Sequence, residues 1–116
     1  MTQEPETQLF RSVVYRALYD ALGFTSVSRN SDAHLEIVTE ARNWFLNPDT
    51  TDFDFVCDMA QLDRRKIKQS SIKLIEARQS GNYSRIPAFW RDCFKRNRAP
   101  SFGALEKDLD VYIVKM

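Results

Sequence analysis

Apolar residues near the start of the chain recur every three or four positions, which is the spacing of one helix face. Over residues 6–22 this face collects Leu9, Phe10, Val13, Val14, Ala17, Leu18, Ala21 and Leu22. Arg11, Arg16 and Asp20 fall on the opposite face. Gly23 follows as a residue that takes the left-handed conformation at little cost. The pattern predicts an amphipathic helix that ends at Gly23, with its charged residues in water.

The periodicity returns after a small, polar stretch over residues 23–31. Ser31 is placed to cap a second helix that runs to residue 45 or 46. The positions that we expect to face inward are Ala33, Leu35, Ile37, Val38, Ala41, Trp44 and Phe45. Pro48 disfavours helix at Asn47, so this helix should end there.

Two closely spaced helices should follow. A short one is expected over residues 53–60, with Thr51 or Asp52 as its cap. Asp63 can cap a longer helix that runs to about Arg78 and ends at Gly81.

The C-terminal part, residues 83–116, reads less clearly. Pro87 suits the first turn of a helix "AFWRDCFKRN", and Ser101 can cap a last turn or two through Lys107. "VYIVKM" has β propensity without an obvious partner, so we expect a short strand or an extended tail. The chain should therefore be mostly α, and its 116 residues form a single domain (1–116).

Charge is unevenly distributed although the net charge is +1. Residues 1–60 carry four Arg against ten Asp and Glu, whereas residues 61–100 carry eleven Lys and Arg against three acids. Such asymmetry indicates a face for nucleic acid or another anionic surface. The two halves could also fold together and neutralise each other, in which case the asymmetry has no functional meaning.

Residues 53–78 fit the spacing of a helix-turn-helix, in which two helices cross steeply over a short turn. Cys57 supplies a small residue at the crossing, Leu62 would fill the turn, and Ile67 would anchor the second helix. Gln61 occupies the turn position that usually holds Gly. It must take a positive φ at a cost of about 1 kcal/mol, or the turn is built differently.

The second of these helices carries the candidate chemistry. Arg and Gln read base edges, whereas Lys and Ser mainly contact phosphates. We therefore expect Arg65 and Gln69 to read bases and the remaining basic residues to bind phosphate. The full candidate set is Arg64, Arg65, Lys66, Lys68, Gln69 and Lys73.

The stretch "EARNWFLNPDTTDFDFVCDMAQLDRRKI", with "LFRSVVYRALYDAL" before it, resembles a pattern in short phage and prophage helix-turn-helix proteins of proteobacteria. In that pattern a helix ending in Trp precedes "DF..VC..A.LD" and a basic helix. The resemblance covers about residues 9–78 and implies DNA binding. The chain departs from it at Gln61, where Gly is usual, and at Arg64, where Pro is frequent.

A second basic group is interleaved with aromatic residues and consists of Arg85, Arg91, Lys95, Arg96 and Arg98. Such a group could follow a phosphate backbone or stack on bases. Phe89, Trp90, Cys93 and Phe94 recur at spacings typical of a helix, which favours a docked helix whose basic residues point outward.

Other classes of function find little support. His34 is the one histidine and has no second ligand at metal spacing, so we expect neither a metal nor a cofactor. Gly-rich phosphate loops and nucleophile–base pairs are missing from the sequence, which disfavours an enzyme. Cys57 and Cys93 read as free thiols of a reducing cytoplasm. The acidic N-terminus is unlike a secretory signal, and apolar runs are too short to span a membrane.

We therefore expect a cytoplasmic protein that binds double-stranded DNA as a phage- or prophage-type transcriptional regulator. A homodimer would be common for such a module, with residues 9–22 or 87–97 as its interface. Two alternatives stay open. One is a phage small terminase subunit, which forms a higher homo-oligomer. The other is a protein-interaction module whose basic face binds an acidic protein partner.

Overall fold

The computed structural model describes residues 5–109, and every regular element in that range is a helix. The helices are α1 (Pro5–Ala21), α2 (Asp32–Leu46), α3 (Thr51–Met59), α4 (Arg64–Ser80), α5 (Ala88–Arg96) and α6 (Phe102–Leu109). The predicted mostly α class is confirmed. The strand or tail expected at "VYIVKM" lies outside the described residues.

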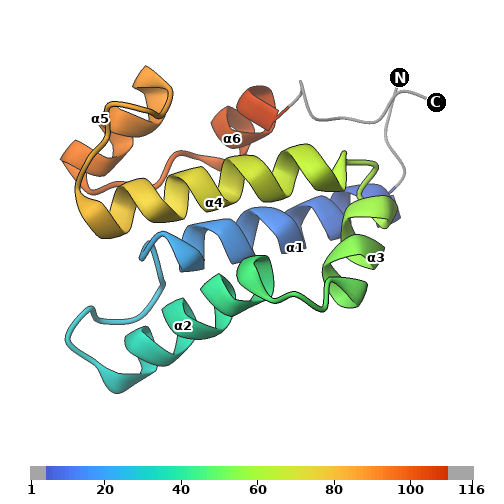
Figure 1. The fold of residues 1–116 in the computed structure, drawn as a ribbon, viewed down its shortest axis with the longest axis horizontal. Helices are drawn as coiled ribbons and strands as arrows, with labels where there is room; N and C mark the ends of the chain where they lie inside the picture. Colours follow the sequence, from blue (N-terminus) through green and yellow to red (C-terminus); the bar gives the residue numbers. More distant parts are fainter. Residues whose placement is uncertain (1–4, 110–116) are drawn as a thin grey trace.

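Helix α1 crosses the middle of the molecule, with α4 along one side and α2 along the other (Figure 1). Helix α3 runs at a steep angle to α4 beside the first residues of α4, whereas α5 lies near the last ones (Figure 1). One apolar core joins these elements, and its largest fully buried side chains include Trp90, Phe45 and Phe53.

Most of the predicted helix ends are confirmed. The Ser31 hydroxyl accepts a hydrogen bond from the His34 amide at 3.2 Å and caps α2. The Ser101 hydroxyl accepts from the Ala104 amide at 3.2 Å in α6. Gly23 and Gly81 have φ values of 89° and 72°, as left-handed residues that follow helices. These ends depend on neighbouring residues in the chain, which explains why a sequence pattern finds them.

The predicted start of α3 is wrong. Thr51 and Asp52 lie inside the helix, whose N-cap is Thr50 without a side-chain bond. Instead, Asp49 Oδ1 accepts hydrogen bonds from the Thr51 amide at 3.1 Å and from the Thr51 hydroxyl at 2.8 Å. Asp49 lies two residues before the first predicted cap, and the helix begins two residues earlier than expected.

The expected inner face of α1 is rotated. Leu9 is 64% exposed and Val13 43%, whereas Arg11, predicted to face water, is 2% exposed. The buried residues of α1 include Thr7, Arg11, Val14 and Leu18, and α2, α3 and α6 all pack against this helix. On α2, Leu35 is likewise 67% exposed and Ala33 is exposed.

Candidate nucleic-acid interface

The turn between α3 and α4 consists of residues 60–63, because α3 ends at Met59 and α4 begins at Arg64. Gln61 has a φ of 56°, so it takes the left-handed conformation that its position was expected to require. The Leu62 amide donates to the Cys57 carbonyl at 3.0 Å, which closes the turn over the end of α3. Cys57, Leu62 and Ile67 are all almost completely buried. The segment therefore consists of two helices joined by a short turn.

Asp63 fixes the start of α4. Its Oδ1 accepts hydrogen bonds from the amides of Arg65 at 3.0 Å and Lys66 at 3.2 Å. These amides belong to the first turn, where helix N–H groups otherwise lack partners. The cap holds the basic first turns of α4 in a defined orientation beside α3.

The six candidate contact residues are not equivalent. Arg65, Lys66, Gln69 and Lys73 are exposed, and Lys68 is half-buried. Within residues 5–109 no ion pair involves Arg65, Lys66, Lys68 or Lys73. Arg65 and Gln69 are four residues apart and so project from the same side of the helix. These positive charges are open to a polyanion.

Arg64 is placed differently. Its guanidinium Nη1 lies 3.8 Å from a carboxylate oxygen of Asp54 and 3.8 Å from one of Asp58, both in α3. Half of this side chain is still accessible, so the pairs stabilise the motif weakly. Arg64 therefore joins the two helices of the motif, a role that the sequence interpretation missed.

The three acids of α3 do not all converge on one point, because Asp52 lies apart from the pair that contacts Arg64. The Asp52 carboxylate accepts a hydrogen bond from the Trp44 indole Nε1 at 2.7 Å, and Asp54 accepts one from the Thr50 hydroxyl at 2.9 Å. Within residues 5–109 no group of three or more His, Cys, Asp or Glu is arranged to hold a metal ion. His34 Nδ1 lies 2.7 Å from the Thr25 hydroxyl, which ties the first loop to α2.

The second basic group is only partly assembled. Trp90, Cys93 and Phe94 are buried, so α5 docks on the core, while Phe89 is 38% exposed. Arg96 pairs with Asp92 on the same helix. Lys95 and Arg98 are exposed and Arg91 is half-buried. Helix α5 itself lies near the last residues of α4 (Figure 1). Arg85 lies apart from these, in the segment before α5, where it lines a pocket with Lys73.

Two arginines have structural roles that were not predicted. Arg11 Nε donates to the Ala60 carbonyl at 2.8 Å, which links α1 to the turn before α4. Arg78 donates to the carbonyls of Leu22 and Phe94 and to Asn97 Oδ1, and its guanidinium lies 5.0 Å from the ring centroids of Phe24 and Phe94. The sequence could have indicated these roles, because Arg11 and Arg78 lie on the same helix faces as residues that are buried.

The buried thiols have little nucleophilic character. Burial, together with the carboxylates of Asp54 and Asp58, raises the pKa of Cys57 to about 12. Burial also raises the pKa of Cys93. Both thiols are reduced and unpaired, as expected. Because the thiolate is the reactive form, neither cysteine is poised for nucleophilic chemistry at neutral pH.

No helix in residues 5–109 has the length and apolar character needed to cross a bilayer.

Comparison with known proteins finds no relative. No protein-family model, curated protein or solved structure matches the chain.

Proposed function

We propose that this protein binds duplex DNA through the first turns of α4 and acts as a transcriptional regulator of phage or prophage type. The observation that carries the proposal is the pairing of helix-turn-helix geometry with an exposed basic second helix. Gln61 takes the required positive φ, and Asp63 orients the first turn of α4. Arg65, Lys66, Gln69 and Lys73 are then presented to solvent.

The contacts divide by chemistry. Arg65 and Gln69 lie one turn apart and suit base edges in the major groove, where Arg pairs with guanine and Gln with adenine. Lys66, Lys68 and Lys73 suit phosphates on either side. Arg64 can reach phosphate only by leaving Asp54 and Asp58, to which it is already paired. We therefore assign it a smaller share of the binding than its position in the motif suggests.

The test is fluorescence anisotropy of a labelled random-sequence duplex, titrated over a range of salt concentrations. Binding should weaken steeply with salt, since each phosphate contact contributes about −0.9 to the slope of log K against log salt. The double variant Arg65→Ala/Lys66→Ala should lower affinity and flatten that slope by about one unit, because Lys66 is the one of the two assigned to phosphate.

The matched control is Arg16→Ala/Arg29→Ala, which removes the same charge from exposed positions outside α4. Its effect on affinity should be small. Absence of binding by the wild-type protein at the lowest salt would reject the proposal. Equal losses in the two double variants would show that general charge, rather than α4, governs binding.

A second candidate is a protein-interaction module whose α4 face binds an acidic protein partner. The α3 acids favour it, because the first turn of α3 carries Asp52 and Asp54 where such motifs approach phosphate. A pull-down with wild-type bait and with the Arg65→Ala/Lys66→Ala bait tests it. A partner captured only by the wild-type bait, together with no DNA binding, would support this candidate over the first.

A further inference from the structure

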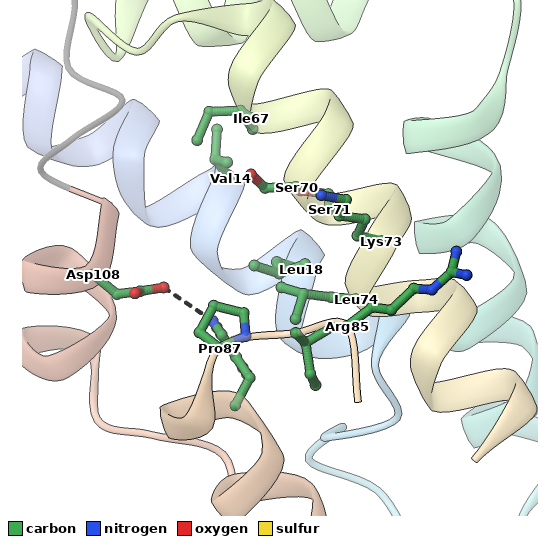
Figure 2. A pocket seen from close by; sticks show the side chains of 12 residues that line it. Val14, Leu18, Ile67, Ser70, Ser71, Lys73, Leu74, Arg85, Pro87 and Asp108 are labelled. Atoms are coloured by element: carbon green, nitrogen blue, oxygen red, sulfur yellow. Dashed lines mark hydrogen bonds between the residues drawn. The ribbon is translucent and has the colours of Figure 1, made fainter. Parts of the chain in front are cut away.

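A pocket of about 280 Å³ lies between α1, α4 and the segment that leads into α5 (Figure 2). Val14 and Leu18 of α1 and Leu74 of α4 form apolar walls, and Pro87 and Trp90 close another side. An apolar cavity of about 150 Å³ is enough to hold benzene. This pocket therefore has room for a ligand about the size of two fused rings.

The polar groups of the pocket are few and are arranged by charge. Figure 2 shows Asp108 on one side, and Lys73 and Arg85 on the other. Lys73 and Arg85 line the pocket and are exposed to solvent. A ligand anion could therefore pair with them without deep burial of charge. The Asp108 carboxylate accepts a hydrogen bond from the Trp90 indole Nε1 at 2.9 Å and retains capacity for a further donor.

Ser71 belongs to the same pocket lining. Its side chain lines the pocket and the residue is only 3% exposed. A hydroxyl can donate and accept hydrogen bonds, so Ser71 adds a further polar group to the pocket wall.

We propose that this pocket binds a small, flat carboxylate with an apolar body and a hydrogen-bond donor at its opposite end. The carboxylate lies toward Lys73 and Arg85, the rings fill the space between Leu18, Leu74 and Trp90, and the donor meets Asp108. A site of this kind fits the usual design of ligand pockets, which are mainly apolar with a few converging polar groups. It stands whether or not the chain binds DNA.

The test uses 6-hydroxy-2-naphthoate as the probe and follows the two tryptophan indole N–H signals by ¹H–¹⁵N NMR. The Trp90 N–H lies in the pocket and donates to Asp108, whereas the Trp44 N–H donates to Asp52 elsewhere. The probe should shift the Trp90 signal saturably and leave that of Trp44 in place. For a ligand of this size we expect a Kd between about 10 μM and 1 mM.

Charge variants test the assigned orientation. Lys73→Gln/Arg85→Gln alters exposed residues, so the fold should persist, and it should raise the Kd of the probe about fivefold. The control Lys95→Gln/Arg98→Gln makes the same charge change outside the pocket and should leave the Kd within about twofold. Binding of 2-naphthol, which lacks the carboxylate, should be equal in all three proteins.

Three results would overturn the proposal. The first is no shift of the Trp90 signal at millimolar probe. The second is equal movement of both indole signals, which would indicate non-specific binding. The third is an unchanged Kd in Lys73→Gln/Arg85→Gln, which would place the carboxylate elsewhere.

Discussion

Arg11 carries a positive charge into the interior and uses it to hold the end of α3. Its Nε donates to Ala60, the C-cap residue of that helix, and its Nη1 lies 3.8 Å from the Glu106 carboxylate of α6. Carbonyls at a helix end have no partner within the helix, so Arg11 satisfies a group that burial would otherwise leave unpaired. One side chain therefore connects α1, the turn and α6.

Replacing Arg11 with Met tests this role because the aliphatic stem is kept. The Ala60 carbonyl would lose its donor, so the free energy of unfolding should fall by about 1–3 kcal/mol in urea denaturation. Arg16→Met, on the exposed side of α1, should change it by less than about 0.5 kcal/mol. An Arg11→Met protein as stable as the wild type would mean that the buried charge costs as much as its hydrogen bond contributes.

Gln61 stores backbone strain in the turn. At a φ of 56° a side chain is disfavoured, whereas Gly is not. Gln61→Gly should raise the free energy of unfolding by about 0.5–1 kcal/mol. The same change at Gln79, inside α4, should lower it by about 1 kcal/mol, because Gly is a poor helix former. A destabilising Gln61→Gly would show that the Gln side chain contributes contacts that outweigh the strain.

Cys57 makes stability sensitive to alkaline pH. Its pKa is raised from 9.0 to about 12 in the folded protein, so the unfolded thiol ionises first as the pH increases. Stability from the buried neutral thiol is therefore complete below about pH 9 and is lost as the pH rises toward 12. Tyr19, whose pKa burial raises from 10.0 to about 12, adds to the same trend.

We expect urea denaturation of the wild type to show a loss of stability between about pH 8 and pH 10.5. Cys57→Ala should lose less over that interval, because the Tyr19 contribution remains. If the free energy of unfolding falls equally in the two proteins, ionisation of the Cys57 thiol does not cause the loss of stability at alkaline pH.

At the scale of elements, α3 and α4 form one electrostatic unit. Asp54 and Asp58 of α3 hold Arg64, and their negative charge stands beside the basic face of α4. The acids orient the second helix of the motif, but they also weaken the attraction of this region for phosphates. If α4 binds DNA as proposed, these acids lower its affinity for phosphates while they hold Arg64 against α3.

Neutralising both acids separates these effects. Asp54→Asn/Asp58→Asn should raise DNA affinity several-fold and steepen the salt slope by about one unit, because Arg64 becomes free to contact a phosphate. Anisotropy measures both quantities. Asp32→Asn/Glu36→Gln, on exposed positions of α2, changes the charge equally and should leave the slope unaltered. If the control variant raises DNA affinity to the same extent, the gain comes from net charge and not from the release of Arg64.

At the scale of the whole molecule, α1 lies at the centre of the fold (Figure 1). Val14 and Leu18 of α1 and Leu22 just after it are buried. Among the large apolar residues of the predicted interface 9–22, Leu9 and Val13 are the exposed ones. The apolar stripe of α5 is likewise used inside the chain, through Trp90 and Phe94. Little of either predicted interface remains for a partner copy.

Native mass spectrometry therefore distinguishes the regulator from a small terminase subunit. We expect assemblies of no more than two chains, since large rings need extensive apolar interfaces. A ring of eight or more chains would contradict the regulator proposal. The control is the Arg65→Ala/Lys66→Ala protein, whose assembly state should match the wild type because α4 points its basic side to solvent.

Local features were predictable where the partners lie within a few residues. Ser31, Asp63 and Gly81 act on amides or carbonyls of their own helix ends, and the spacing of Cys57, Leu62 and Ile67 reflects contacts within the motif. The positive φ of Gln61 is one of the two outcomes that the turn pattern allowed. The start of α3 was misplaced because Asp49, Thr51 and Asp52 offer competing caps in a short stretch.

The sequence by itself determined the helical class, most helix ends and the basic character of α4, because periodicity, capping and charge are properties of neighbouring residues. Only the tertiary structure decided which side of α1 is buried, which acids hold Arg64, and that Lys73, Arg85 and Asp108 surround one pocket. These depend on residues far apart in the chain, such as Arg11 and Ala60. The spacing of apolar residues along the chain leaves several faces of a helix nearly equivalent, and the packing of the helices decides which face is buried.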